Sequence, residues 1–222
     1  MPIFSDYPIS SVVIAGAGGF GLELFDYLEE NAAQGGPAVA GFIDDTSGLR
    51  VPDGINRPLL GDIRNFRAQA GQVVLVAVGS VKGRMAVLAA LWANGVRTPA
   101  FAANSAIVSP AAILGEATVI CPLAIINRNA QLGVGVVVNV HCSVGHGASI
   151  GDYSVLSPYA ALNGEARLGR RCFLGSRATV YPGISIGDDC VIDSHTGVRA
   201  HAEEKKIISS RSVYQVNNLR IF

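Results

Sequence analysis

Four histidines, His141, His146, His195 and His201, all stand in the second half of the chain. Imidazole titrates near neutrality, so a histidine can take a proton from an attacking group as a general base. His146 follows the aliphatic residue Val144 by two positions in a repeat that points Val144 inward. We therefore expect His146 on the outer surface, where a neighbouring subunit could cover it. A histidine that only packs at such an interface is the alternative.

A glycine-rich segment, Gly16–Gly21 with the sequence GAGGFG, follows an apolar run and precedes a helical pattern. Backbone amides at such a turn, together with the helix N-terminus, can hold a pyrophosphate. The acidic residues Asp44 and Asp45 end the next apolar run, where they could accept hydrogen bonds from a base or a ribose. The first part of the chain is too short for a full doubly wound sheet, which argues against a dinucleotide cofactor. A turn that serves only strand–helix packing is the alternative.

Apolar and amphipathic segments alternate between about residues 11 and 100, as in a small parallel α/β unit. Strands are expected at 11–16, 38–45 and 72–79, and helices at 22–30 and 84–95. Leu24 and Leu28 have helical spacing, and Trp92 is expected in the core. Asn94 and Gly95 are a typical helix end.

After about Val108 the helical period gives way to a period of six. Every sixth residue is aliphatic, and the column comprises Val108, Leu114, Ile120, Ile126, Leu132, Val138, Val144, Ile150, Leu156, Leu162, Leu168, Leu174, Val180, Ile186, Ile192 and Val198. A second column, four residues later, is small or β-branched, and a third, one residue later, is often Gly or Asn, as expected for tight corners. This is the hexapeptide repeat of a parallel β-helix.

Composition excludes several classes of protein. The 222 residues carry 17 basic and 17 acidic side chains, so no basic excess favours nucleic acid or a membrane surface. Half of the residues are hydrophobic, which excludes intrinsic disorder. The uncharged stretch 129–151 is too rich in Gly, Asn and His for a membrane span. No secretory signal is visible, so we expect a cytoplasmic protein.

The cysteines are expected to be buried thiols. No Cys-x-x-Cys pair is present, and three of the four cysteines, Cys142, Cys172 and Cys190, fall in the small inward column.

The chain resembles the NeuD/PglD family of sugar acyltransferases over nearly its whole length. The resemblance rests on GAGGFG, GFIDD, GSVKGR and NVHCSVGHGASIGDYSVL, together with the hexapeptide repeat. It implies an α/β Rossmann-like nucleotide-sugar domain at 1–102, an all-β left-handed parallel β-helix at 103–205 and a C-terminal segment at 206–222. It also implies a homotrimer that transfers an acetyl group from acetyl-CoA to the amino group of a UDP- or GDP-4-amino-sugar, for glycan or lipopolysaccharide synthesis.

The same resemblance implies roles for individual residues. It assigns the general base to His146 and a further catalytic position to Asn139, and no metal or enzyme nucleophile is needed, because the thioester brings its own leaving group. Backbone amides at the corners could hold the oxyanion. CoA contacts fall on Gly164 and Ser176. The nucleotide-sugar contacts are Gly18, Gly19, Phe20, Asp44, Asp45, Ser80 and Arg84.

The chain departs from the family at several positions. Relatives usually follow the catalytic histidine with an acidic residue, whereas Gly147 stands here; a backbone carbonyl, Asp152 or Glu165 could replace that carboxylate, or His146 is a weaker base. Phe20 stands where many relatives carry histidine. The segment 193–196 and the ending VYQVNNLRIF also differ from relatives, which puts CoA binding by the last coil in question.

Other functions stay open at this point. A sugar O-acetyltransferase of the sialic-acid type would use the same residues, and a non-catalytic nucleotide-sugar scaffold would bind without turnover. A zinc enzyme would use His141 and His146, five residues apart, but Ser105 stands near the place where a third histidine is required.

Overall fold

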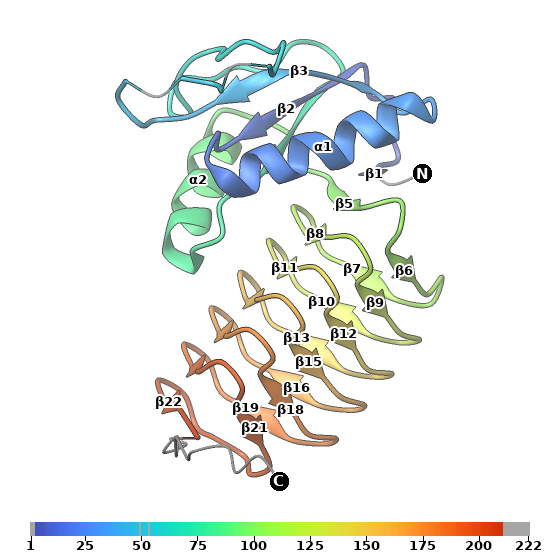
Figure 1. The fold of residues 1–222 in the computed structure, drawn as a ribbon, viewed down its shortest axis with the longest axis vertical. Helices are drawn as coiled ribbons and strands as arrows, with labels where there is room; N and C mark the ends of the chain where they lie inside the picture. Colours follow the sequence, from blue (N-terminus) through green and yellow to red (C-terminus); the bar gives the residue numbers. More distant parts are fainter. Residues whose placement is uncertain (1–2, 49, 53, 211–222) are drawn as a thin grey trace, which may run out of the picture.

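The computed structural model describes residues 3–48, 50–52 and 54–210. Its first part is a three-stranded parallel sheet in the order β3-β2-β4, with β2 at Ser11–Ala15, β3 at Ala38–Ile43 and β4 at Gln72–Val76 (Figure 1). Helix α1 (Gly19–Ala33) follows β2, and helix α2 (Val81–Ala93) follows β4. The expected alternation of strands and helices is confirmed, although α1 is longer than its apolar pattern indicated.

The two helices cover opposite faces of this sheet. Leu24 and Leu28 of α1 belong to the buried cluster that contains Val12 and Ile14, whereas Leu88 and Leu91 of α2 belong to the cluster with Val13 and Ala15. Successive side chains of a strand point to opposite faces, so β2 supplies both clusters. All three strands are therefore continuous apolar runs rather than alternating ones.

The second part is a parallel β-solenoid of short strands (Figure 1). Strand β1 (Ile3–Phe4) joins the edge of this solenoid. The other strands are β5 (Ala100–Ala102), β6 (Ile107–Val108), β7 (Ile113–Leu114), β8 (Val119–Ile120), β9 (Ile125–Ile126), β10 (Gln131–Leu132), β11 (Val137–Val138), β12 (Ser143–Val144), β13 (Ser149–Ile150), β14 (Val155–Leu156), β15 (Ala161–Leu162), β16 (Arg167–Leu168), β17 (Phe173–Leu174), β18 (Thr179–Val180), β19 (Ser185–Ile186), β20 (Val191–Ile192), β21 (Gly197–Val198) and β22 (Ile207–Ile208). They form sheets of eight, five and six strands.

The six-residue register of the sequence is confirmed along the solenoid. The aliphatic column is the second residue of each strand from β6 to β21, and it is buried from Ile120 to Val198. Ladder partners lie eighteen residues apart, as in Val138 with Leu156, so one coil is three hexapeptides. The small column, including Cys142, Ala160 and Ala178, packs against the aliphatic column in one continuous core.

The expectation that glycines of the third column turn the corners is wrong. The left-handed backbone lies three residues after each aliphatic residue from Leu114 to Ile192 and is mostly not glycine, as at Leu123 (φ 61°) and Tyr159 (φ 63°). A Cβ added to Gly151 would lie 2.5 Å from the amide nitrogen of Arg170 in the next coil. These glycines therefore allow adjacent coils to approach closely.

The left-handed residues define three corners of the solenoid. The first corner contains Ala117, Gly135, Tyr153, Arg171 and Asp189; the second contains Leu123, His141, Tyr159, Arg177 and His195; the third contains Asn129, Gly147, Glu165 and Gly183. The six-stranded sheet lies between the second and third corners, and we call its outer surface the small-residue face. Its outward positions include Ser143, Ala161 and Thr179.

The two parts of the chain share contacts. Strand β1 pairs antiparallel with β5, which continues into the eight-stranded solenoid sheet, and the α2 side chain Arg84 reaches the first corner. The boundary near residue 102 stays a prediction, and residues 211–222 of the predicted C-terminal segment lie outside the described residues. Within the part of the chain that the structure describes, neither helix is long and apolar enough to cross a membrane.

Candidate active site

The loops after β2, β3 and β4 meet at one edge of the N-terminal sheet, because parallel strands end on the same side. They bring Gly18, Gly19 and Phe20 to the start of α1, Asp44 and Asp45 to the end of β3, and Ser80 to the start of α2. The amide of Ala77 donates to the carbonyl of Ala15, which ties two of these loops together.

Packing explains only some of the glycines in the Gly16–Gly21 loop. A Cβ at Gly16 would lie 2.8 Å from the carbonyl oxygen of Ala77, and one at Gly21 would collide with the carbonyl of Gly16. Gly18 and Gly19, in contrast, are exposed and face open space. Gly18 is the N-cap of α1 without a side-chain cap, so the first amides of the helix have no side-chain acceptor there. This is the part of the loop that suits a phosphate.

The two aspartates hold the loops around this edge. Asp44 accepts 2.8 Å hydrogen bonds from the amides of Ala17 and Thr46. Burial alone would raise the pKa of Asp44, but these bonds to its charged form outweigh burial and lower the pKa. Asp45 is exposed and accepts a 2.8 Å bond from the amide of Ile63. The Oδ2 of Asp45 also lies 3.4 Å from Nε of Arg64, and its side chain is 35% exposed, so part of this carboxylate faces solvent.

Ser80 caps α2, since its Oγ accepts a 3.2 Å bond from the amide of Gly83 and remains exposed. The expectation for Arg84 needs correction. Its side chain is completely buried, and its guanidinium donates to the carbonyl oxygens of Val76 (2.5 Å), Gly135 (2.7 Å) and Ala117. Burial lowers the pKa of Arg84 to about 9, so the group is still charged at neutral pH. Arg84 joins α2 to the solenoid and cannot reach a nucleotide.

His146 projects from the third corner with its side chain 73% exposed, as its position in the repeat predicts. Its Nδ1 lies 3.6 Å from Oε1 of Glu165, whose side chain is 67% exposed. Glu165 belongs to the next coil, and its amide donates a 2.9 Å bond to the carbonyl of His146. The two side chains are therefore stacked neighbours along the solenoid rather than neighbours in sequence.

Two glycines make room for this pair. A Cβ at Gly164 would lie 2.6 Å from Nε2 of His146, so the imidazole lies over this glycine. A Cβ at Gly147, where φ is 63°, would lie 2.7 Å from the carboxyl carbon of Glu165. Asp152, the other carboxylate considered from sequence, is at the first corner and accepts from the amide of Val134. Only Glu165 of these two lies beside the histidine.

One chain does not bring all the predicted residues together. Asn139 is half-buried just before the second corner, and its Oδ1 accepts a 2.7 Å bond from the amide of Val140. Ser176 is also at the second corner, whereas His146 and Gly164 are at the third. Asn139 and Ser176 therefore border the small-residue face on one side, and His146 and Gly164 border it on the other.

The second corner carries a ladder of large side chains, of which only His141 was considered from the sequence. The rings of His141 and Tyr159 stack at 4.6 Å, and the guanidinium of Arg177 lies 4.9 Å from the centre of the Tyr159 ring. The sequence could have predicted this ladder, because residues eighteen positions apart stack in successive coils. His141 and His146 therefore point from different corners, and no group of three possible metal ligands occurs within residues 3–48, 50–52 and 54–210.

The cysteines are buried free thiols, as expected. Burial raises the pKa of Cys142 to about 12 and that of Cys172 to about 11, which makes both poor nucleophiles near neutral pH.

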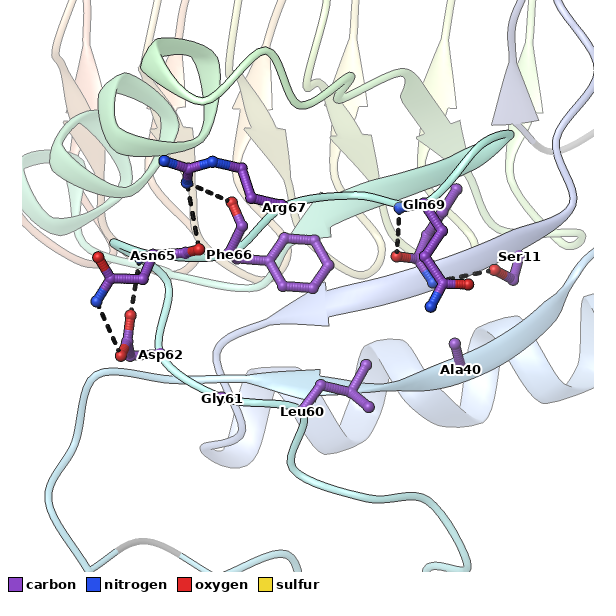
Figure 2. Close-up of a pocket in the computed structure, with 10 residues that line it drawn as sticks. Ser11, Ala40, Leu60, Gly61, Asp62, Asn65, Phe66, Arg67 and Gln69 are labelled. Atoms are coloured by element: carbon purple, nitrogen blue, oxygen red, sulfur yellow. Dashed lines mark hydrogen bonds between the residues drawn. The ribbon is translucent and has the colours of Figure 1, made fainter.

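A hollow of about 510 Å³ is lined by Ser11, Ala40, Gln72 and residues of the segment 60–69. Figure 2 shows the side chains that line it. Its polar groups are engaged locally: Asp62 accepts from Asn65, and Arg67 donates to the carbonyls of Asn65 and Phe66. None of the residues singled out from the sequence lines it. The hollow therefore adds no member to the candidate site.

Comparison with known proteins supports the repeat and the fold. Residues 166–194 match the family model described as the hexapeptide repeat of succinyl-transferase. A comparison with curated proteins finds no match.

Solved structures are similar along nearly the whole chain. One is a histidine variant of perosamine N-acetyltransferase from Caulobacter crescentus, solved with CoA and GDP-perosamine (27% identity, 92% of this chain and 96% of that one, TM-score 0.79). Others are the acetyltransferase domain of PglB from Neisseria gonorrhoeae (24%, 89% and 95%, TM-score 0.79) and WeeI from Acinetobacter baumannii (21%, 91% and 97%, TM-score 0.77). The repeat and this likeness confirm the resemblance to the NeuD/PglD family of sugar acyltransferases.

Proposed function

We propose that the protein is an acetyltransferase that moves an acetyl group from acetyl-CoA to the amino group of a nucleotide-linked amino sugar. The observation that carries the proposal is the exposed imidazole of His146 at a corner of the solenoid, beside a face of small residues. The 27% identity to perosamine N-acetyltransferase over 92% of the chain supports the same reaction. We further propose that the solenoid is left-handed and that the α/β part before it is a Rossmann-like unit.

His146 acts as the general base. Acetyl-CoA supplies a thioester whose carbonyl carbon is attacked and whose thiolate leaves. His146 accepts a proton from the attacking amine through Nε2 as the new C–N bond forms, and it returns that proton to the leaving sulfur as the C–S bond breaks. The reaction therefore requires no metal and no enzyme nucleophile. The backbone amides of the coil corners are available to stabilise the developing oxyanion.

The small-residue face suits an extended, slender chain such as pantetheine. Ser143, Ala161 and Thr179 present short outward side chains along it, with Gly164 at one edge and Ser176 at the other. Gly164 also has a second explanation, since the His146 ring occupies the space above it. We therefore assign the acetyl donor to this face, with Ser176 as the residue at its far edge.

The sugar nucleotide is assigned to the edge of the N-terminal sheet. The open backbone at Gly18 and Gly19 suits the diphosphate, and the exposed Asp45 carboxylate can accept from a ribose or base. Phe20 and Ser80 border the same edge, whereas Asp44 fixes the loop.

We propose a homotrimer in which the third corner of one copy faces the second corner of its neighbour. An exposed base needs walls that exclude water, and a single chain leaves Asn139 and His146 at different corners. The ladder of His141, Tyr159 and Arg177 offers a broad surface for such a neighbour. Ile107 and Ile125, which are exposed on the small-residue face, add apolar area to the proposed interface.

The test is acetyl transfer to UDP- and GDP-linked 4-amino sugars, followed through the release of free CoA thiol and mass spectrometry of the product. His146→Ala is expected to lower kcat by about 10² to 10⁴-fold. Arg67→Ala removes an exposed side chain of the N-terminal part, away from the second and third corners; it is the control and should keep full activity. Binding of both substrates without turnover in the wild type would refute the transferase and leave a scaffold.

A further inference from the structure

This inference rests on the proposed function and deepens it. We propose that Glu165, supplied by the next coil, is the positioning residue for His146 and takes the place of an acidic residue next to the histidine in sequence. Its carboxylate accepts the Nδ1–H of the imidazole, which leaves Nε2 unprotonated and able to take the proton of the attacking amine.

The stacking of coils places the two side chains together. Glu165 follows His146 by nineteen residues, which is one coil and one position, and its amide is hydrogen-bonded to the carbonyl of His146 at 2.9 Å. The 3.6 Å between Nδ1 and Oε1 is slightly longer than a hydrogen bond. Both side chains are exposed, so a small torsional change closes that gap, and catalytic hydrogen bonds commonly shorten when substrate binds.

The glycines around the pair support this assignment independently of the distance. Gly147 occupies the position of the expected acidic residue, and a Cβ there would lie 2.7 Å from the carboxyl carbon of Glu165, so a side chain at 147 would require this carboxylate to move away. Gly164 leaves open the space that the imidazole fills. A glycine at 147 and a glutamate at 165 therefore fit together, because the glycine leaves space for the carboxylate beside the imidazole.

No other carboxylate among the described residues competes for this role. Asp152 is bonded to the amide of Val134 at another corner. Within the described chain, the only ion pair of Glu165 is the one with His146, so no arginine or lysine draws the carboxylate away. The carboxylate is thus free to orient the ring.

The first measurement needs no turnover. The ¹⁵N shifts of the neutral His146 imidazole report which ring nitrogen carries the proton. Wild-type protein is expected to hold mainly the Nδ1–H tautomer, and Glu165→Ala to move the population toward Nε2–H. Glu204→Ala removes an exposed glutamate that pairs with Lys205, and it should leave the tautomer unchanged.

Kinetics then test the consequence. Glu165→Ala is expected to lower kcat by about tenfold to a hundredfold with little change in either KM, because the residue positions the base without binding substrate. The double variant Gly147→Asp with Glu165→Ala restores a carboxylate beside the ring in vacated space, and aspartate tolerates left-handed backbone. It should recover the Nδ1–H tautomer and part of kcat, while Gly147→Asp alone should not gain activity.

An unchanged tautomer in Glu165→Ala would overturn the assignment, whatever the kinetics. An inactive wild type whose tautomer still responds to Glu165→Ala would instead refute the proposed function and retain the pairing. The melting temperature of each variant, compared with that of Glu204→Ala, separates loss of fold from loss of positioning.

Discussion

Replacing Arg84 by methionine should destabilise the protein strongly, because the side chain is a buried bridge between α2 and two coils. Methionine fills much of the volume but leaves the carbonyl oxygens of Val76, Ala117 and Gly135 without the donor they now have. Each buried carbonyl that loses its partner costs about 1–3 kcal/mol, and relief from burying the charge offsets part of the sum. We expect a net loss of about 3 kcal/mol in the free energy of unfolding.

For a chain of this size, that loss lowers the melting temperature by about 6–12 °C. Arg84→Lys keeps a positive charge but lacks the planar fork, so it should fall between methionine and the wild type. Scanning calorimetry measures all three proteins. Arg67→Met is the matched control, since Arg67 also donates to two backbone carbonyls but is exposed, and it should change the melting temperature by no more than about 1 °C. A melting temperature of Arg84→Met within about 2 °C of the wild type would refute the reasoning.

Three further predictions concern the site and the core. Gly164→Ala should displace the His146 ring and lower kcat more than it raises the KM for acetyl-CoA; the opposite pattern in steady-state kinetics would assign Gly164 to CoA contact instead. The buried thiols Cys142 and Cys172, whose pKa values burial raises, should react with Ellman's reagent only after denaturation, and rapid labelling of the native protein would contradict that burial. The pKa of Asp44 is lowered, so the hydrogen bonds of its carboxylate stabilise the fold above its unfolded-state pKa and are lost as the pH falls through the folded-state value. Asp44→Asn should therefore make the melting temperature fall less steeply at acidic pH. If that acidic part of the profile did not change, other carboxylates would be responsible for it.

The solenoid was predictable from sequence because its geometry repeats. A residue in one hexapeptide occupies the same environment as the residue six positions later, so Val144, Ile150 and Leu156 could be placed in the core without knowing any contact. What the periodicity could not reveal is why a column is glycine. The glycines of the third column let the backbones of adjacent coils approach closely, and only coordinates distinguish that requirement from a left-handed turn.

The error at Arg84 has a signal in the sequence. Arg84, Leu88 and Leu91 share one helical stripe, and all three are buried. The resemblance to the sugar acyltransferases implied a ligand contact for Arg84, but its position on the apolar stripe indicated the interior. The neighbour of His146 was also hard to predict from sequence, because Glu165 lies beside it only once one coil is known to be eighteen residues. The distance between Asn139 and a partner's His146 depends on an assembly that one sequence does not specify.

The pairing of β1 with β5 has a consequence for the entropy of folding. Ladder contacts in the solenoid join residues eighteen apart, so each added coil closes a loop of the same modest length, as in other repeat proteins. Ile3 and Phe101, in contrast, close a loop of close to a hundred residues. Loop-closure entropy makes that contact about 1.5 kcal/mol more costly than one coil step. The coils can therefore add one at a time at constant cost, while the strand that covers the first coil depends on the α/β unit between its ends being compact already.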